Sequence, residues 1–162
     1  MSKETTVLIE HSIEIERPIR EVFDFYQTPD NFRRVTDGAA GVELERLPSD
    51  FRPGSVFAYR LRGWPVELRW EALLSEYRPP ERLVNVQANG LFLEWSHEHH
   101  FVQLDQPGTK TRIRGLLTYR MPKGLINSLA HRLYVRKKLE EFVTESLDNA
   151  RQLLEETTPS KR

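Results

Sequence analysis

The sequence contains no cysteine, which excludes disulfide bonds, thiolate metal sites and thiol nucleophiles. No apolar run approaches the ~20 residues that a membrane-spanning helix needs. The first residues, MSKETTVLIEHS, are charged and lack the apolar core of a secretory signal. Lys+Arg and Asp+Glu both number 24, so the overall charge does not attract nucleic acid. These absences predict a cytoplasmic protein that neither inserts stably into a membrane nor binds nucleic acid.

Several motifs of enzyme active sites are absent as well. No serine lies in a G-x-S-x-G context, and there is no Gly-rich phosphate loop. The glutamates of the predicted strands fall mainly on the outer side, so no carboxylate pair of the glycosidase kind faces inward. Serine hydrolase, nucleotide-dependent and glycosidase chemistry are therefore not expected.

The 162 residues, 38% hydrophobic and 30% charged, suit one globular domain. We expect this domain to span residues 1–157 and to be followed by a disordered tail, 158–162. Residues 7–16 alternate apolar and polar as a half-buried strand does. Two short amphipathic helices are predicted after it, up to the stop signal Asp37-Gly38.

Residues 41–120 have the alternation of β-strands. A two-residue turn at Arg62-Gly63 would put the apolar residues of both flanking strands on one side. The pairs expected from that turn are Leu61 with Trp64, Tyr59 with Val66 and Phe57 with Leu68.

Asn89-Gly90 is the strongest short hairpin signal in the chain. A two-residue turn there pairs Val86 with Leu93 and Val84 with Trp95. It places Val84, Val86 and Ala88 in the core and Asn85 and Gln87 outside. In the next hairpin, an odd loop or a bulge near residues 105–108 is needed to set His97, His99 and Phe101 beside Ile113, Gly115 and Leu117; we predict the bulge.

Residues after Pro122 are predicted to be helical to about residue 157. Two apolar stripes in this stretch are out of phase by roughly a quarter turn, so a bend or a change of helix is expected between Tyr134 and Lys138. The first stripe contains Leu125, Leu129 and Leu133, and the second contains Val135, Leu139, Phe142, Val143, Leu147, Ala150 and Leu154. The long helix would cover the concave face of a curved antiparallel sheet of about six to seven strands, an α+β fold.

Three segments carry a resemblance to a known superfamily: IERPIREVFDFYQTPDNF, LVNVQANGLFLEWSHEHHF and TYRMPKGLINSLAHRLYVRKKLEEF. Together they resemble the START-like (SRPBCC) superfamily of lipid-transfer, pollen-allergen and polyketide cyclase/dehydrase proteins, and within it a bacterial ligand-binding branch. The resemblance implies the helix-grip fold and a hydrophobic cavity. The last strand of that branch often carries an acidic residue near Gly115 of this chain, and its absence argues against acid/base chemistry from that strand.

His97 and His99 are expected on the concave face, between Trp95 and Phe101. Burying titratable groups is costly unless they have partners, so these imidazoles are candidates to hydrogen-bond a ligand. The alternative is that protein or water satisfies them. The predicted ligand-binding residues are Phe57, Tyr59, Leu68, Trp70, Val86, Trp95, His97, His99, Phe101, Leu117, Tyr119, Leu139 and Phe142.

A metal is not expected, because H-x-H at 97–99 has no evident third ligand on the inward faces. His11 and His131 are too uncertain in position to supply it. The basic residues around the expected helix break are interpreted as a solvated face, with contact to an anionic head group or a partner as the alternative. This basic cluster contains His131, Arg132, Arg136, Lys137 and Lys138.

Three functions remain open, and the first is favoured. The chain could bind or carry a small, mostly apolar or amphipathic molecule of lipid, polyketide or aromatic type, without a cofactor. It could instead be a cofactor-free cyclase, dehydratase or isomerase with His97 or His99 as general acid/base. It could also be a protein-interaction module, such as a chaperone or ribosome accessory. The oligomeric state is not predicted.

Overall fold

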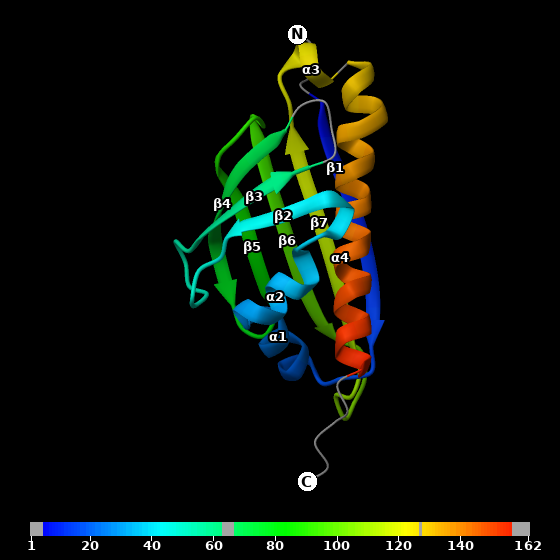
Figure 1. The fold of residues 1–162 in the computed structure, drawn as a ribbon. Helices are drawn as coiled ribbons and strands as arrows, with labels where there is room; N and C mark the ends of the chain where they lie inside the picture. The colour runs from blue at the N-terminus through cyan, green and yellow to red at the C-terminus, as the bar shows by residue number, and fades with distance from the viewer. Residues whose placement is uncertain (1–4, 63–66, 127, 157–162) are drawn as a thin grey trace.

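The computed structural model describes residues 5–62, 67–126 and 128–156 and contains a seven-stranded antiparallel sheet that curls around a long C-terminal helix (Figure 1). The strand order is β1-β7-β6-β5-β4-β3-β2. Short helices α1 and α2 lie at one end of the sheet and α3 at the other (Figure 1). The tail predicted at 158–162 lies outside the described residues. The elements are β1 (Thr6–Ile15), α1 (Ile19–Gln27), α2 (Pro29–Thr36), η1 (Ala39–Gly41), β2 (Val42–Arg46), β3 (Val56–Leu61), β4 (Leu68–Arg78), β5 (Arg82–Asn89), β6 (Glu94–Gln103), β7 (Thr111–Arg120), α3 (Lys123–Ile126), η2 (His131–Val135) and α4 (Arg136–Glu156).

The first strand and the helix pair follow the predicted periodicities. On β1, Ile9, Ile13 and Ile15 are buried while the glutamates between them are exposed. Helix α1 buries Phe23 and Tyr26 against the sheet, and α2 follows after Thr28 with Pro29 as its first residue, where the missing N–H is tolerated. This end of the molecule is therefore closed by the two short helices.

The register predicted between β3 and β4 is wrong, although the faces are right. Phe57 pairs with Ala72, Tyr59 with Trp70 and Leu61 with Leu68. The predicted pairs of Trp64 and Val66 fall outside the described residues. The predicted register would also have set Pro65 opposite Arg60, where a proline has no N–H to donate to the sheet. The register differs by an even number of residues, so the same side chains stay inward.

The connection between β5 and β6 is also longer than predicted, and here the observed register differs from the predicted one by an odd number of residues. Asn85 pairs with His97 and Val86 with Ser96, so Asn85 is buried inside and Val86 is partly exposed on the outer face. All three predicted inward placements are therefore wrong: Ala88 is exposed, Val86 is partly exposed, and Val84 is buried but lies on the outer face, opposite Glu98.

The side chain of Gln87 explains the longer connection. Its amide donates to the Phe92 carbonyl at 2.7 Å and accepts from the Phe92 N–H at 3.3 Å, replacing a backbone pair of the sheet. This arrangement turns Phe92 into the core. Gly90 permits it, because a Cβ at this position would lie 2.7 Å from Cβ of Trp70.

The hairpin between β6 and β7 has the predicted faces without the predicted bulge. Phe101 pairs with Ile113, His99 with Gly115 and His97 with Leu117, in a register that does not shift between Glu94 and Gln103. The connection from 104 to 110 has an odd number of residues, which satisfies the parity without a bulge. Asp105 holds it closed by accepting from the backbone N–H groups of Thr109 and Lys110.

The predicted change of helix is present as a π-helical turn, η2, directly before α4. The N–H of Arg136 bonds to the carbonyl of His131, five residues back. A π turn shifts the phase of the side chains that follow it. Leu129 and Leu133 consequently face outward, whereas Val135 and Leu139 are buried.

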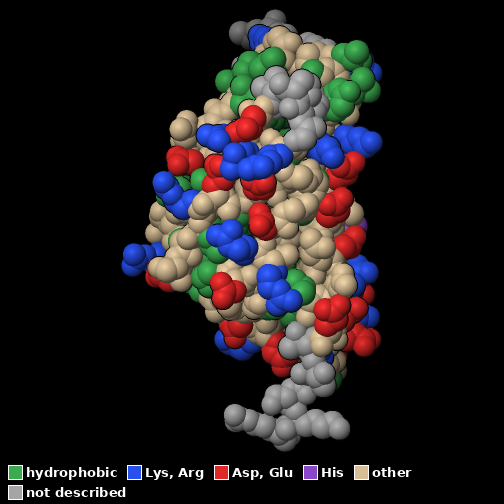
Figure 2. All heavy atoms as spheres, viewed as in Figure 1, with side chains coloured by type: hydrophobic (Ala, Val, Ile, Leu, Met, Phe, Trp, Pro, Cys, Tyr) green, Lys and Arg blue, Asp and Glu red, His purple; other side chains and the backbone are tan. Residues whose placement is uncertain are grey.

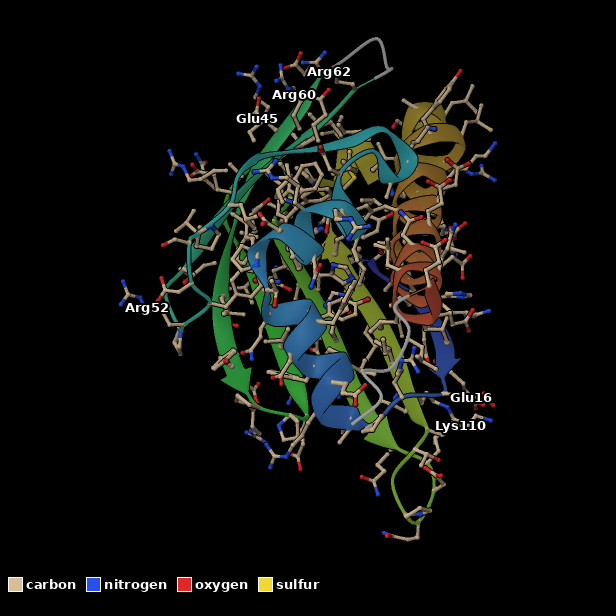
Figure 3. All side chains as sticks on the ribbon, turned by 60° about the horizontal axis from the view of Figure 1, so that its bottom comes forward. Glu16, Glu45, Arg52, Arg60, Arg62 and Lys110 are labelled. Atoms are coloured by element: carbon tan, nitrogen blue, oxygen red, sulfur yellow. The ribbon has the colours of Figure 1, made fainter. Side chains whose placement is uncertain are left out.

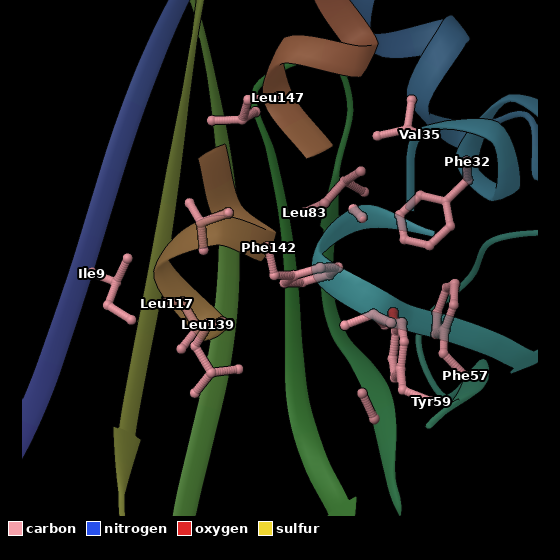
Figure 4. Close-up of a cluster of buried hydrophobic side chains, with 14 of the residues drawn as sticks. Ile9, Phe32, Val35, Phe57, Tyr59, Leu83, Leu117, Leu139, Phe142 and Leu147 are labelled. Carbon is pink, nitrogen blue, oxygen red and sulfur yellow. The ribbon is translucent and has the colours of Figure 1, made fainter. Parts of the chain in front are cut away.

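Helix α4 packs along β1 and β7 and is tied to the opposite side of the molecule. The Glu145 carboxylate accepts from the backbone N–H of Ala40 at 2.6 Å, and the Asn149 amide donates to the carbonyl of Val35 at 3.1 Å. Figure 4 shows Leu139, Phe142 and Leu147 of the helix facing Leu117 and Leu83 of the sheet. The core thus lies between α4 and the concave face.

The outer face of β2, β3 and β4 is covered by ion pairs instead. Arg60 lies 2.7 Å from a Glu45 carboxylate oxygen and 3.4 Å from one of Glu43, and Arg62 lies 2.7 Å from Glu43. Figure 3 shows Glu45, Arg60 and Arg62 pointing away from the helix. Such exposed pairs contribute little stability, but they leave only the concave face to bury apolar surface.

Gly115 sets how closely α4 approaches β7. A Cβ at this position would lie 3.1 Å from Cδ1 of Leu147 and 3.5 Å from Cγ1 of Val143. We expect Gly115→Ala to change the free energy of unfolding by less than about 1 kcal/mol, because lower chain entropy offsets the tight contact. Gly115→Val is expected to cost about 1–3 kcal/mol by pushing the helix away. Urea denaturation measures both.

A double variant provides the control. Leu147→Ala removes the atom that the valine meets, so the cost of Gly115→Val should be smaller in that background than in the unchanged chain. Equal costs in both backgrounds would show that the helix does not approach the sheet through this glycine.

Candidate functional site

The candidate site is the middle of β6, where three side chains in alternate positions point beneath α4. Trp95, His97 and His99 are all buried, the two histidines with 6% and 4% of their surface exposed. On the neighbouring strands, Asn85 lies opposite His97 and Gly115 opposite His99. The predicted inward face of β6 is therefore correct.

Ring contacts join these side chains to β4 and to the helix. The rings of His97 and His99 lie 4.4 Å apart, and His97 lies 5.8 Å from Phe142 of α4. The Trp95 ring lies 6.2 Å from Trp70, centroid to centroid. The Trp95 and His97 rings lie 6.1 Å apart, so the five rings form one continuous row of contacts from β4 to α4.

Other residues predicted to bind a ligand are packed against the short helices. Phe101 contacts Phe23 and Tyr26 at 5.2 and 5.4 Å. Phe57 contacts Phe32 and lies beside the stacked pair of Tyr59 and Trp70. These contacts fill the α1–α2 end with aromatic core, so the predicted set divides into a packed end and the region around the histidines.

The interior carries a group of buried polar atoms without hydrogen-bond partners among the described residues. They come from three strands and helix α1, and all belong to side chains on the concave side. The atoms are Tyr26 Oη, Trp70 Nε1, Asn85 Oδ1, Trp95 Nε1, His97 Nε2 and His99 Nδ1. Native proteins leave few such groups, because each costs about 1–3 kcal/mol when unpaired. Their concentration around His97 and His99 marks this region as different from the rest of the core.

Burial keeps both imidazoles neutral at pH 7. Loss of solvent lowers the pKa of His97 to about 4. The pKa of His99 is held well below its ordinary value, first by burial and then by the neighbouring charges that His97 and His100 would carry. A neutral imidazole has one donor and one acceptor nitrogen, so each histidine can offer a ligand either function.

The α3 end of the interior is closed by a hydrogen bond between sheet and π turn. The hydroxyl of Tyr119 lies 2.8 Å from Nε2 of His131, and both residues are buried. Burial raises the pKa of Tyr119 to about 12, so the phenol keeps its proton. The prediction that His131 belongs to a solvated basic face is therefore wrong. Its side chain belongs to the interior.

The structure buries all of the predicted ligand-binding residues except Val86. Sequence reasoning missed Asn85, because an assumed two-residue turn reversed the parity of β5. It also left out Tyr26 and Phe92. The glutamine at 87 was the available signal, since a side-chain amide near a hairpin can substitute for a backbone pair.

Within residues 5–62, 67–126 and 128–156, no three His, Asp or Glu side chains come together in a way that could hold a metal ion. Over the same residues, every helix is too short or too polar to cross a bilayer. His11 lies on β1 with Nε2 3.7 Å from the Asp148 carboxylate, and β7 separates it from the histidines of β6.

Comparison with known proteins finds similarity in structure but not in sequence. No family model and no curated protein sequence matches the chain. The aromatase/cyclase Zhui from Streptomyces sp. R1128 superimposes with a TM-score of 0.73 at 12% identity, covering 96% of this chain and 98% of that one. Norcoclaurine synthase from Thalictrum flavum, a point mutant bound to a transition-state analogue, gives 0.69 at 14% identity, with 96% and 98% covered. The protein TTHA0849 from Thermus thermophilus gives 0.69 at 17% identity, with 94% and 99% covered.

These similarities extend over nearly the whole of each chain and include the curled sheet, the short helices after β1 and the long C-terminal helix. At such low identity they establish the architecture alone. The chain therefore has the same helix-grip fold as these solved structures, a curled antiparallel sheet around a long C-terminal helix.

Proposed function

We propose that this protein binds a small, mostly apolar molecule with one or two polar groups, between the middle of β6 and helix α4. The observation that carries the proposal is the group of unpartnered buried polar atoms around His97 and His99. Buried donors and acceptors need partners, and a ligand or ordered water must supply them. Trp70, Trp95 and Phe142 would provide the apolar walls, as ligand sites usually combine such walls with a few polar groups.

The electrostatics favour binding over catalysis by these histidines. A general base works best when its pKa lies near the working pH, and the pKa of His97 is about 4. A neutral imidazole of that kind accepts or donates a hydrogen bond without taking the proton away. The enzymes among the structural neighbours, an aromatase/cyclase and norcoclaurine synthase, keep the cyclase alternative open as a second candidate.

The test uses 1-naphthol as the probe, because it joins a flat apolar body to one hydroxyl group. We expect calorimetric titration to show a single site, and His97→Leu to weaken binding about fivefold through loss of one hydrogen bond. His100→Leu is the matched control, since His100 lies on the outer face of the same strand beside Glu98. It should leave the affinity unchanged.

Native mass spectrometry of the purified protein gives an independent reading, because a retained cellular ligand would appear as added mass. Two results together would contradict the proposal. The first is that the purified protein carries no added ligand mass. The second is that 1-naphthol either binds the unchanged protein and both histidine variants with equal affinity or binds none of the three.

A further inference from the structure

Large apolar side chains are exposed together at the α3 end of the molecule. Leu125, Leu129 and Leu133 are 41%, 69% and 53% exposed. Figure 2 shows hydrophobic side chains gathered at this end, with Lys and Arg side chains beside them. We call the exposed group the apolar patch; it comprises Leu91, Leu93, Leu125, Leu129, Leu133 and Tyr134. Clusters of this kind on a protein surface usually mark a site of interaction.

Two separate parts of the chain contribute to the apolar patch. Leu91 and Leu93 come from the connection between β5 and β6, and the others from α3, η2 and the residues between them. The N–H of Leu93 donates to the carbonyl of Arg120 at 2.8 Å, which ties that connection to the end of β7, just before α3 begins. Both parts of the patch therefore lie at the same end of the sheet, where β7 ends and α3 begins.

The charge around the apolar patch has one dominant sign. No Asp or Glu occurs between Asp105 and Glu140, although the whole chain is neutral. Residues 123–141 carry five Lys and Arg and only two Glu. Arg136, Lys137 and Lys138 share those two carboxylates, at 3.0–3.8 Å, so the segment remains net positive. Lys123, Arg132 and Lys137 are exposed beside the leucines.

We propose that the apolar patch, together with the basic flank formed by Lys123, Arg132 and Lys137, docks the protein on the surface of an anionic lipid bilayer. Leucines that enter the interface and basic side chains that meet anionic head groups are the two contributions that hold a peripheral helix on a membrane. A second copy of this chain is a poorer occupant, since a symmetric contact would set one positive flank against another. The inner side of the same segment carries His131 and Val135, which close the interior.

The experiment measures binding of the full chain to vesicles by co-sedimentation. We use vesicles of phosphatidylcholine alone and with about one-third phosphatidylglycerol, an anionic lipid. Binding is expected on the anionic vesicles, at least about tenfold stronger than on the neutral ones, and weaker at high salt. The triple variant Leu125→Ser, Leu129→Ser, Leu133→Ser is expected to lower the partition coefficient at least about tenfold. Arg132→Gln with Lys137→Gln should lower it by a similar factor.

Matched controls exchange exposed residues of the same types elsewhere. Val102→Ser, at the other end of β6, and Arg52→Gln, in the connection before β3, should bind vesicles as the unchanged chain does. Every patch residue exchanged is exposed, so the thermal midpoint of all variants should stay the same, and 1-naphthol binding should not change. The proposal fails if neither vesicle binds, if both bind equally, or if the triple variant binds anionic vesicles undiminished. It also fails if the triple substitution instead dissociates a dimer in sedimentation velocity, since a second copy would then occupy the patch.

Discussion

Lowering the pH from 7 to 5 is expected to destabilise the protein by about 2 kcal/mol through His97 alone. In the unfolded chain this histidine takes up a proton near its ordinary pKa of 6.5, whereas in the fold its pKa is about 4. Between these two values the unfolded state binds more protons, so stability falls as the pH falls. His99 adds a loss of the same sign, because burial also lowers its pKa.

Urea denaturation at several pH values between 7 and 5 measures this slope. The double variant His97→Gln, His99→Gln should lose most of this slope in the window, whatever its stability at pH 7. His100→Gln should keep the slope, since His100 is partly exposed on the outer face. The window stays above the ordinary pKa values of Asp and Glu, which keeps the carboxylates from dominating the result.

Histidine titration by NMR checks the cause separately. Side-chain signals of His97 and His99 that titrate near pH 6.5 would mean that water reaches both rings. That outcome would contradict the buried site and remove the reason for assigning ligand contacts to these nitrogens.

The strand faces of this fold were largely predictable from sequence because side chains alternate with a period of two. Trp95, His97 and His99 were placed correctly, although the predicted bulge in their hairpin does not exist. Any connection with an odd number of residues gives the same parity as a bulge, so the pattern could not separate the two.

The failure at β5 has a different origin. Asn89-Gly90 is a strong signal for a two-residue turn, and the prediction followed it. In the fold, the amide of Gln87 pairs with the backbone of Phe92 and lengthens the connection. A contact made by a side chain is invisible to periodicity, and the odd shift exchanged Val86 for Asn85 in the interior.

The π turn shows where a sequence pattern was informative without being complete. Two stripes out of phase correctly predicted a change of helix, yet not which stripe would face water. Packing decides that question: the second stripe lies over β1 and β7, where Gly115 lets Leu147 approach. The first stripe is left exposed, and it supplies three residues of the apolar patch.

Truncating Phe142 to alanine is expected to cost about 3–5 kcal/mol of the free energy of unfolding, the usual range for a buried phenylalanine. The side chain is buried on α4 and faces the sheet (Figure 4). Its ring lies 5.8 Å from the ring of His97. Tyr134→Ala, which removes an exposed ring, should change stability by no more than about 0.5 kcal/mol.

The size of the loss also reports on the space around Phe142. A ring enclosed by protein atoms on all sides loses both its transfer free energy and its packing contacts, whereas a ring bordering a ligand space lacks contacts on that side. If Phe142 is a wall of the binding site, Phe142→Ala should lower the free energy of unfolding by about 3 kcal/mol. The space that this variant opens beside His97 should then admit probes bulkier than 1-naphthol. A loss of about 5 kcal/mol, with no higher affinity for bulkier probes, would indicate a filled core at this position. The proposed ligand would then have to lie away from α4.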